Sequence, residues 1–158
     1  MRRAYNKKYG KVVFAYTIKK SDRAKYHYED ENVSLTFTKV EQRGETGTFV
    51  ILYMTCRNKT DKAHVPSSLL RNLINVQYDK KYKTVESPGA WYIYKLNKFV
   101  HPNVVDPSEY VVLPNETVKT YMPLLLDEPG NPFKIIKKDE FIKNKKIKTN
   151  FKFRTKKM

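Results

Sequence analysis

The hydrophobic pattern of this chain is dominated by alternation between apolar and polar residues with a period of two. In residues 32–40 (NVSLTFTKV), Val33, Leu35 and Phe37 alternate with serine and threonine, which is the pattern of a half-buried strand. Residues 48–58 (TFVILYMTCRN) are the most strongly apolar segment, and we expect them to form the central strand. No long segment repeats apolar residues at three and four, so helices are expected to be few.

Further short runs of β-branched and aromatic residues predict the remaining strands, at residues 11–18, 73–78, 82–85, 90–96, 109–113 and 117–126. Residues 69–79 also permit a short helix that passes into a strand. A hairpin is expected around residues 79–81 (Asp-Lys-Lys), and turns at residues 43–47 (RGETG) and at Pro114-Asn115-Glu116. Pro123 lies inside a predicted strand, which indicates an edge strand or a bulge there.

Seven or eight short strands at spacings of about ten residues predict an all-β protein, an antiparallel sandwich or barrel. The sequence contains no internal repeat. We expect one β-sandwich domain at residues 28–136, between a basic N-terminal arm with one strand at residues 1–27 and a basic C-terminal arm at residues 137–158.

The middle of the chain resembles a known family. Residues 49–85 give an apolar strand, an Asn-Lys-Thr turn, a loop, and a strand that ends in a hairpin with Tyr82; residues 111–135 give a strand, a Pro-Asn-Glu turn and another strand. This order is similar to that of the immunoglobulin-like β-sandwich domains of unknown function in Gram-positive lipoproteins and exported antigens. The resemblance covers about residues 32–136, with Asn115 where glycine is usual. It implies an immunoglobulin-like sandwich with a binding or assembly role and no catalytic residues.

Charge is distributed very unevenly along the chain, whose net charge is +16 over 158 residues. Residues 1–25 hold nine basic residues against one acidic residue, and residues 134–158 hold eleven against two. The intervening residues 26–133 are nearly neutral, with twelve basic and thirteen acidic residues. Because like charges repel, folding alone does not favour such ends, whereas a polyanionic partner does. The alternative is that the lysines serve only solubility, although a solubility bias should also extend into the body.

The two ends interleave aromatic residues with the basic ones. In NFKFRTK (150–156), Phe151 and Phe153 lie on one face of an extended strand and the basic residues on the other. The rings either stack on nucleobases or anchor the strand to the core, and Tyr5 and Tyr9 are placed in the same way. The candidate nucleic-acid-binding residues are Arg2, Arg3, Lys7, Lys8, Lys11, Lys143, Lys145, Lys146, Lys148, Lys152, Arg154, Lys156 and Lys157.

Other residue types give little indication of catalysis. The single cysteine, Cys56, excludes a disulfide within the chain and is expected to be a small buried strand residue. His27, His64 and His101 form no spaced metal-binding pair, and the acidic residues 29–31 are more often solvated than metal-bound. No phosphate-binding glycine loop is present. We therefore expect no enzymatic activity, no metal and no cofactor.

These observations predict a non-enzymatic structural or assembly protein whose basic arms bind a polyanion, with nucleic acid in a nucleoprotein particle (virion, ribosome-associated or mobile-element) as the first hypothesis. Other protein subunits of an assembly are possible partners. The alternative is an immunoglobulin-like module that binds protein or the cell envelope, with arms that contact acidic protein or anionic lipid. Since no apolar signal or membrane-spanning run is found, we expect the protein in the cytoplasm or within a nucleoprotein or virus particle.

Overall fold

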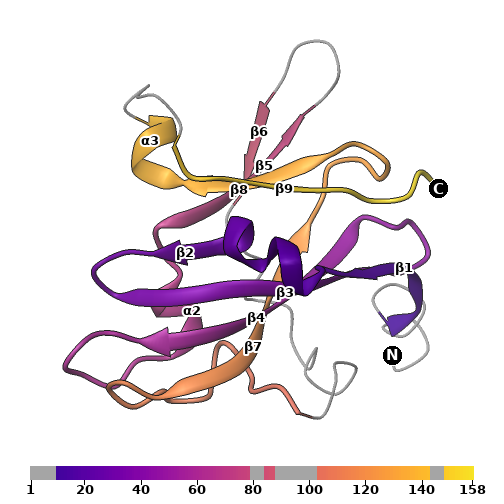
Figure 1. Cartoon of the computed structure of the whole chain (residues 1–158). Coiled ribbons are helices and arrows are strands. Elements are labelled where there is room, and N and C mark those ends of the chain that lie inside the picture. Colours follow the sequence, from indigo (N-terminus) through magenta and orange to yellow (C-terminus); the bar gives the residue numbers. More distant parts are fainter. Residues whose placement is uncertain (1–9, 79–83, 88–102, 143–147) are drawn as a thin grey trace.

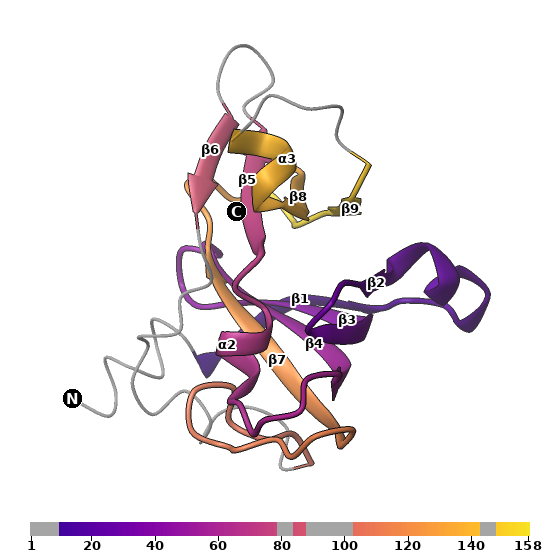
Figure 2. The same cartoon turned by 90° about the vertical axis from the view of Figure 1, so that its left-hand side faces the viewer.

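The computed structural model describes residues 10–78, 84–87, 103–142 and 148–158. Strands dominate it, and they form two antiparallel sheets that lie one above the other (Figures 1 and 2). The prediction of an all-β, antiparallel fold is therefore confirmed. Nine strands lie within the described residues, more than the seven or eight expected for the sandwich, because β2 and β8 were not among the predicted runs and the extended strand at β9 was assigned to the C-terminal arm.

The first sheet has the order β1-β3-β4-β7, and β2 also pairs with β3. The long strand β4 lies between β3 and β7, as expected for the most apolar segment of the chain. On its other side β3 pairs first with β2 and then with β1, and its pairing with β4 has a register shift between Phe37 and Lys39. The bounds of the strands are β1 Val12–Thr17, β2 His27–Glu29, β3 Val33–Arg43, β4 Phe49–Asn58 and β7 Thr117–Leu125.

The second sheet has the order β6-β5-β8-β9. Its strands are β5 Leu73–Tyr78, β6 Thr84–Ser87, β8 Phe133–Lys137 and β9 Asn150–Phe153. Within the described ranges, three short helical elements accompany the sheets: the 3-10 helix η2 (Lys20–Tyr26) between β1 and β2, α2 (Pro66–Leu69) before β5, and α3 (Lys138–Ile142) directly after β8. Residues 69–79 were expected to pass from a short helix into a strand. The strand is β5, but α2 lies before this range and shares only Leu69 with it, and residues 70–72 form a turn.

The core lies between the two sheets and follows from the alternation in the sequence. Val33, Leu35 and Phe37 all face inward and are at most 1% exposed. They meet the apolar side chains of β4 and β7 and, from the second sheet, Phe133 and Ile135. Cys56 belongs to the same core and is fully buried, as expected. One continuous hydrophobic cluster therefore joins both sheets into a sandwich.

Two turns need a left-handed backbone, and the sequence supplies residues that tolerate it. Gly44 has a φ of 89° in the turn between β3 and β4, where a side chain would be strained. Asn115 has a φ of 65° in the turn before β7. Asparagine is the residue that most readily replaces glycine in this conformation, so the Pro-Asn-Glu turn forms without glycine.

Pro123 lies in β7, which is at the end of the order of described strands in the first sheet. The backbone bonds from Asn58 N to Glu116 O and from Leu126 N to Thr48 O show that even-numbered residues of β7 direct their peptide groups towards β4. Odd-numbered residues direct theirs outward, as Lys119 O does to Val105 N. The missing N–H of Pro123 is therefore on the outer side and removes no bond to β4. The prediction of an edge strand at this proline is confirmed.

Other expectations differ from the structure. Residues 109–113 were expected to form a strand, but only Val112 pairs, through an isolated bridge to His64. Val111 and Leu113 on either side of it are exposed, so this apolar run has no sheet to join. The predicted strand at residues 90–96 lies outside the described residues.

The expected domain boundaries also need correction. The sandwich does not end at residue 136, because β9 pairs with β8 and is the edge strand of the second sheet. At the other end of the chain, β1 pairs along β3 and belongs to the first sheet. The described parts of both basic ends are therefore built into the sandwich, since each contributes a strand that buries side chains or completes backbone pairing.

Candidate functional site

The aromatic side chains of β9 are buried in the core. Phe151 is 7% exposed and Phe153 is 3% exposed. Their rings lie 5.4 Å and 5.3 Å from the ring of Phe37, and Phe153 also stacks on Phe133 at 5.3 Å. Both rings therefore anchor β9 to the sandwich. They are closed to a nucleobase, so the stacking role considered for Phe151 and Phe153 is wrong.

Polar contacts hold the residues after β9 against the N-terminal edge of the molecule. We call residues 148–158 the C-terminal segment and residues 10–28 the N-terminal segment. Tyr26 donates a hydrogen bond from its hydroxyl to the carbonyl oxygen of Lys152 at 2.9 Å. The backbone N–H of Arg154 donates to the hydroxyl oxygen of Tyr16 at 3.1 Å. These two bonds join parts of the chain that are more than a hundred residues apart in the sequence.

The side chain of Gln42 forms a third contact between β3 and the C-terminal segment. Its Oε1 accepts from the Lys156 N–H at 2.7 Å, and its Nε2 donates to the Lys156 carbonyl at 2.8 Å. Gln42 is fully buried, so its amide replaces a neighbouring strand as the partner of that backbone. Gly130 permits the same close approach from the second sheet, because a Cβ there would lie 2.9 Å from Lys157 Cα.

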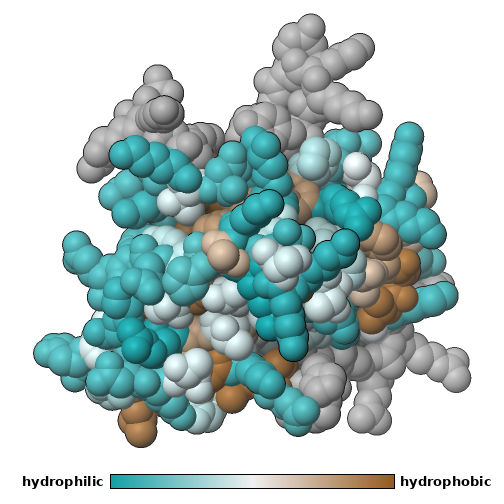
Figure 3. Space-filling model, in the orientation of Figure 1, coloured by the Kyte–Doolittle hydropathy of each residue, from teal (hydrophilic) through white to brown (hydrophobic). Residues whose placement is uncertain are grey.

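This packing brings the two basic ends of the chain onto one surface, which we call the basic seam. It carries ten basic residues. Among the described residues, Asp22 is the only acidic one within the two segments, and Glu140 of α3 also contacts the seam by accepting hydrogen bonds from the backbone N–H of Lys148 and Thr149. Asp22 lies 4.0 Å from Lys25, a distance at which an exposed ion pair contributes little. Figure 3 shows this face as largely hydrophilic. The basic residues of the seam are Lys11, Lys19, Lys20, Arg23, Lys25, Lys148, Lys152, Arg154, Lys156 and Lys157.

Nine of the ten basic residues are exposed, and Arg23 is half-buried. The seam therefore includes five of the predicted nucleic-acid-binding residues in the C-terminal segment, together with Lys11. The other predicted residues lie outside the described residues: Arg2, Arg3, Tyr5, Lys7, Lys8, Tyr9, Lys143, Lys145 and Lys146. Sequence reasoning missed the contribution of η2 with Lys20, Arg23 and Lys25. The run KKSDRAK was the available signal, since it is basic and follows a strand directly.

The acidic run at residues 29–31 has a structural role at the turn between β2 and β3. Asp30 accepts hydrogen bonds from the backbone N–H of Asn32 at 2.7 Å and of Val33 at 3.0 Å, and from the Tyr28 hydroxyl at 2.6 Å. Burial alone would raise the pKa of Asp30, but these hydrogen bonds outweigh it and the pKa is lowered. Within the described residues no group of three or more potential ligands could hold a metal ion.

A second charged network lies at the other end of the first sheet. Glu41 accepts hydrogen bonds from Arg43 and from the Tyr53 hydroxyl, each at 2.6 Å. Burial would raise the pKa of Glu41, yet these bonds and the charge of Arg43 lower it. Burial and the bond to Glu41 together raise the pKa of Tyr53. Each charge is matched by its neighbours, so this network stabilises the sheet and supplies no activated base.

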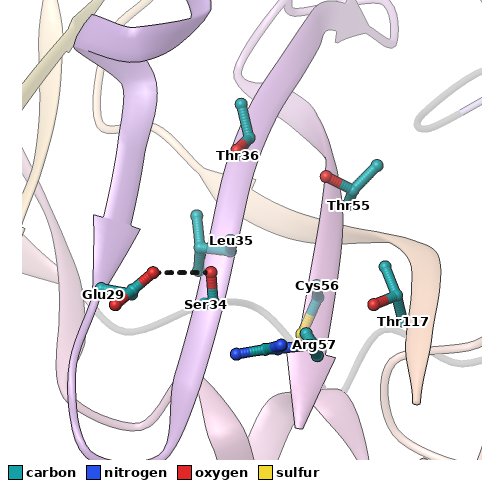
Figure 4. Close-up of a pocket in the computed structure, with 8 residues that line it drawn as sticks. All are labelled: Glu29, Ser34, Leu35, Thr36, Thr55, Cys56, Arg57 and Thr117. Atoms are coloured by element: carbon teal, nitrogen blue, oxygen red, sulfur yellow. Dashed lines mark hydrogen bonds between the residues drawn. The ribbon is translucent and has the colours of Figure 1, made fainter. Parts of the chain in front are cut away.

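A shallow depression of about 330 Å³ lies on the outer face of the first sheet. Figure 4 shows Glu29, Ser34, Thr36, Thr55, Arg57 and Thr117 along it, from β2, β3, β4 and β7. Ser34 donates to Glu29 at 3.2 Å. Cys56 also borders the depression, but burial raises the pKa of its thiol to about 12, so the thiol remains protonated at neutral pH. The lining offers hydrogen bonds and not an activated nucleophile.

The histidines of the described residues have ordinary partners. His27 is exposed, and its ring nitrogens lie 2.9 Å from Thr36 Oγ1 and 3.2 Å from Glu29 Oε1. His64 contributes its backbone to the bridge with Val112. His101 lies outside the described residues. No helix among the described residues is long and apolar enough to cross a membrane.

Comparison with known proteins identifies no family for this chain. No family model and no curated protein matches it. Among solved structures, it is similar to a functionally unknown protein from Listeria monocytogenes EGD-e, with 10% identity and a TM-score of 0.48 over 96% of this chain and 92% of the other. It is also similar to a conserved hypothetical protein from Bacillus anthracis, with 13% identity and a TM-score of 0.42 over 80% and 92% of the two chains. Neither likeness carries an argument about function.

Proposed function

We propose that this protein is a non-enzymatic β-sandwich that binds nucleic acid through the basic seam, as an assembly component of a nucleoprotein particle. One observation carries the proposal. The two ends that hold the excess positive charge are bonded to each other, Tyr26 to Lys152 and Tyr16 to Arg154. Two weakly binding charged tails thereby become one surface with a fixed arrangement of cations.

The charge of the seam is the physical reason for a polyanionic partner. Bringing ten basic residues together against the two acidic residues Asp22 and Glu140 costs electrostatic free energy, which a neutral partner does not offset. A phosphate backbone does offset it, because each lysine or arginine that contacts a phosphate releases condensed counterions. Such contacts position the strand and carry no sequence information, so the proposed binding is largely independent of sequence.

The sandwich supplies the rigid support for this surface. We infer that it is an immunoglobulin-like scaffold, as the resemblance of residues 32–136 implies. Under this proposal the sheets hold the seam, other protein subunits of the particle are further partners, and the protein acts in the cytoplasm or in the particle itself. No step of the proposed role requires a cofactor, a metal or a catalytic residue.

Fluorescence anisotropy with labelled DNA and RNA 20-mers across a salt series tests the proposal. We expect tight binding at low salt that weakens steeply as salt is added. The triple variant Lys20→Glu, Lys152→Glu, Lys156→Glu alters three exposed seam residues. It should weaken binding to single strands and lower the slope of log K against log salt by about 0.7 for each phosphate that is no longer neutralised.

A control variant distinguishes the effect of the seam residues on affinity from the effect of net charge alone. Lys62→Glu, Arg71→Glu, Lys119→Glu changes the net charge by the same amount at exposed positions outside the seam. It should retain most of the affinity. Equal losses of affinity in both triple variants would contradict a localised site. Binding to vesicles that contain phosphatidylserine, without binding to any oligonucleotide, would overturn the proposal in favour of the envelope-binding alternative.

A further inference from the structure

Three side chains with planar groups lie together in the basic seam, and we call them the platform; the planes of its two rings are tilted by 51° to each other. The rings of Phe14 and Tyr16 on β1 lie 5.7 Å apart. The guanidinium carbon of Arg154 lies 4.7 Å from the centre of the Tyr16 ring and 5.7 Å from that of Phe14. The bond from the Arg154 N–H to the Tyr16 hydroxyl fixes the backbone at this point. The guanidinium is thus held over two rings by both its backbone and its side chain.

The platform remains open towards solvent. Arg154 is exposed, Phe14 is half-buried, and Tyr16 is half-buried and also packs against the core. This distinguishes them from Phe151 and Phe153, which the core encloses. Lys152 and Lys156 alternate with buried or half-buried residues and are exposed on either side of Arg154 along the segment. Flat groups suited to a base therefore lie between cations suited to phosphates.

We propose that Phe14, Tyr16 and Arg154 stack on unpaired nucleobases and make the basic seam selective for single-stranded nucleic acid. This inference rests on the proposed function. A guanidinium plane or an aromatic ring stacks on any base, so the selectivity is for strandedness and not for sequence. In a duplex both faces of each base are already covered by neighbouring base pairs. A duplex is therefore bound only through contacts between the basic residues of the seam and its phosphates.

The identity of residue 154 is important for this role. A lysine would supply the same charge but no plane, because its ammonium group is compact and strongly hydrated. Arginine is planar, weakly hydrated and able to stack on an aromatic ring with one face while it presents the other. The position over Tyr16 pre-orders the side chain, which reduces the entropy lost when a base binds.

The test compares three labelled probes with the full chain: a dT 20-mer, an abasic 20-mer with the same phosphates, and a 20-bp duplex. Stacking predicts that the dT 20-mer binds about tenfold or more tighter than the abasic strand at the same salt concentration. In Arg154→Lys this ratio should fall towards one, although the charge is unchanged. Phe14→Leu, which removes a ring and keeps an apolar side chain, should lower the ratio in the same direction.

The outcomes distinguish this inference from the proposed function. If the dT and abasic strands bind equally to the wild-type protein, the stacking platform is wrong and the charge-based proposal stands. If Arg154→Lys keeps the full ratio while its urea midpoint is unchanged, the platform is also wrong. If no probe binds at low salt, both are overturned. Lys62→Arg, outside the seam, is the control that should leave the ratio unaltered.

Discussion

The two basic ends of the chain have similar compositions but are attached to the molecule by different means. β1 and β2 are held mainly by backbone pairing along β3, and between Val12 and Glu29 only Ile18 and Tyr28 are buried. The short β9 instead inserts two phenylalanine rings into the core, and buried Gln42 holds the backbone that follows it. One end is therefore attached through its main chain and the other largely through side chains.

This difference has a consequence for mutation. Backbone pairing survives most substitutions of exposed side chains, because the peptide groups remain in place. Attachment through buried side chains depends on a few residues, each of which carries a large share of the free energy. Substitutions should therefore be more costly in the C-terminal segment than in the N-terminal one, and the following experiments test that contrast.

The largest effect is expected for Phe153→Ala. It removes a ring that is packed against Phe37 and Phe133, so the free energy of unfolding should fall by about 3–5 kcal/mol. Urea denaturation followed by circular dichroism measures the loss. A loss below about 1 kcal/mol would mean that β9 is not held by its side chains, and would contradict the proposed difference between the attachment of the two ends.

Gln42→Leu should have the next largest effect. The substitution keeps the volume nearly constant but leaves the N–H and C=O of Lys156 without their buried partners, at a cost of about 1–3 kcal/mol. Limited proteolysis should also cleave the C-terminal segment faster than in the wild-type protein. Unchanged cleavage with reduced global stability would show that Gln42 supports the core alone.

The turn between β2 and β3, which follows the N-terminal segment directly, should be distinguished by its dependence on pH. The pKa of Asp30 is lowered in the folded state, so the folded protein binds fewer protons than the unfolded chain near the ordinary carboxyl pKa of about 4. The stabilising contribution of the Asp30 carboxylate is complete above a pH of about 4 and is lost as the pH falls through the lowered pKa of the folded state. Asp30→Asn should cost about 1–2 kcal/mol at pH 7 and weaken this acid dependence. Urea titrations at pH 3 to 7 measure both.

The smallest effect is expected at Tyr26, which bonds the two segments to each other. Tyr26→Phe removes the single bond to the Lys152 carbonyl and should cost about 0.5–1.5 kcal/mol. Thr17→Ala on exposed β1 is the matched control and should change stability by less than about 0.5 kcal/mol. A larger effect in the control than in Tyr26→Phe would reverse the order that the two modes of attachment predict.

Local pattern was enough to predict much of the first sheet. The alternation in residues 32–40 indicated β3, the apolar run indicated the central strand β4, and Pro123 indicated the edge strand. These features depend on neighbours in the sequence and on burial of one face. EYVVL at residues 109–113 is also rich in β-branched and aromatic residues, but only Val112 forms a bridge. Strand pairing also needs a partner strand at the right distance, which the local pattern does not reveal.

The candidate site was predictable only in part. The excess charge at both ends is a property of composition, and it was visible without a structure. That the ends meet depends on Tyr16, Tyr26 and Gln42, whose partners lie more than a hundred residues away in the sequence. The sequence could not distinguish an anchoring phenylalanine from a base-stacking one, since both alternate with lysine in NFKFRTK.

The outward orientation of Pro123 also affects how separate molecules meet. An edge strand normally offers a row of free peptide N–H groups, which can recruit a strand from a second molecule and begin aggregation. At position 123 β7 has no such group, so a strand that paired along the part of this edge beyond the Lys119–Val105 bond would lack a hydrogen bond there. One proline in β7 therefore opposes such pairing between molecules without weakening the pairing with β4.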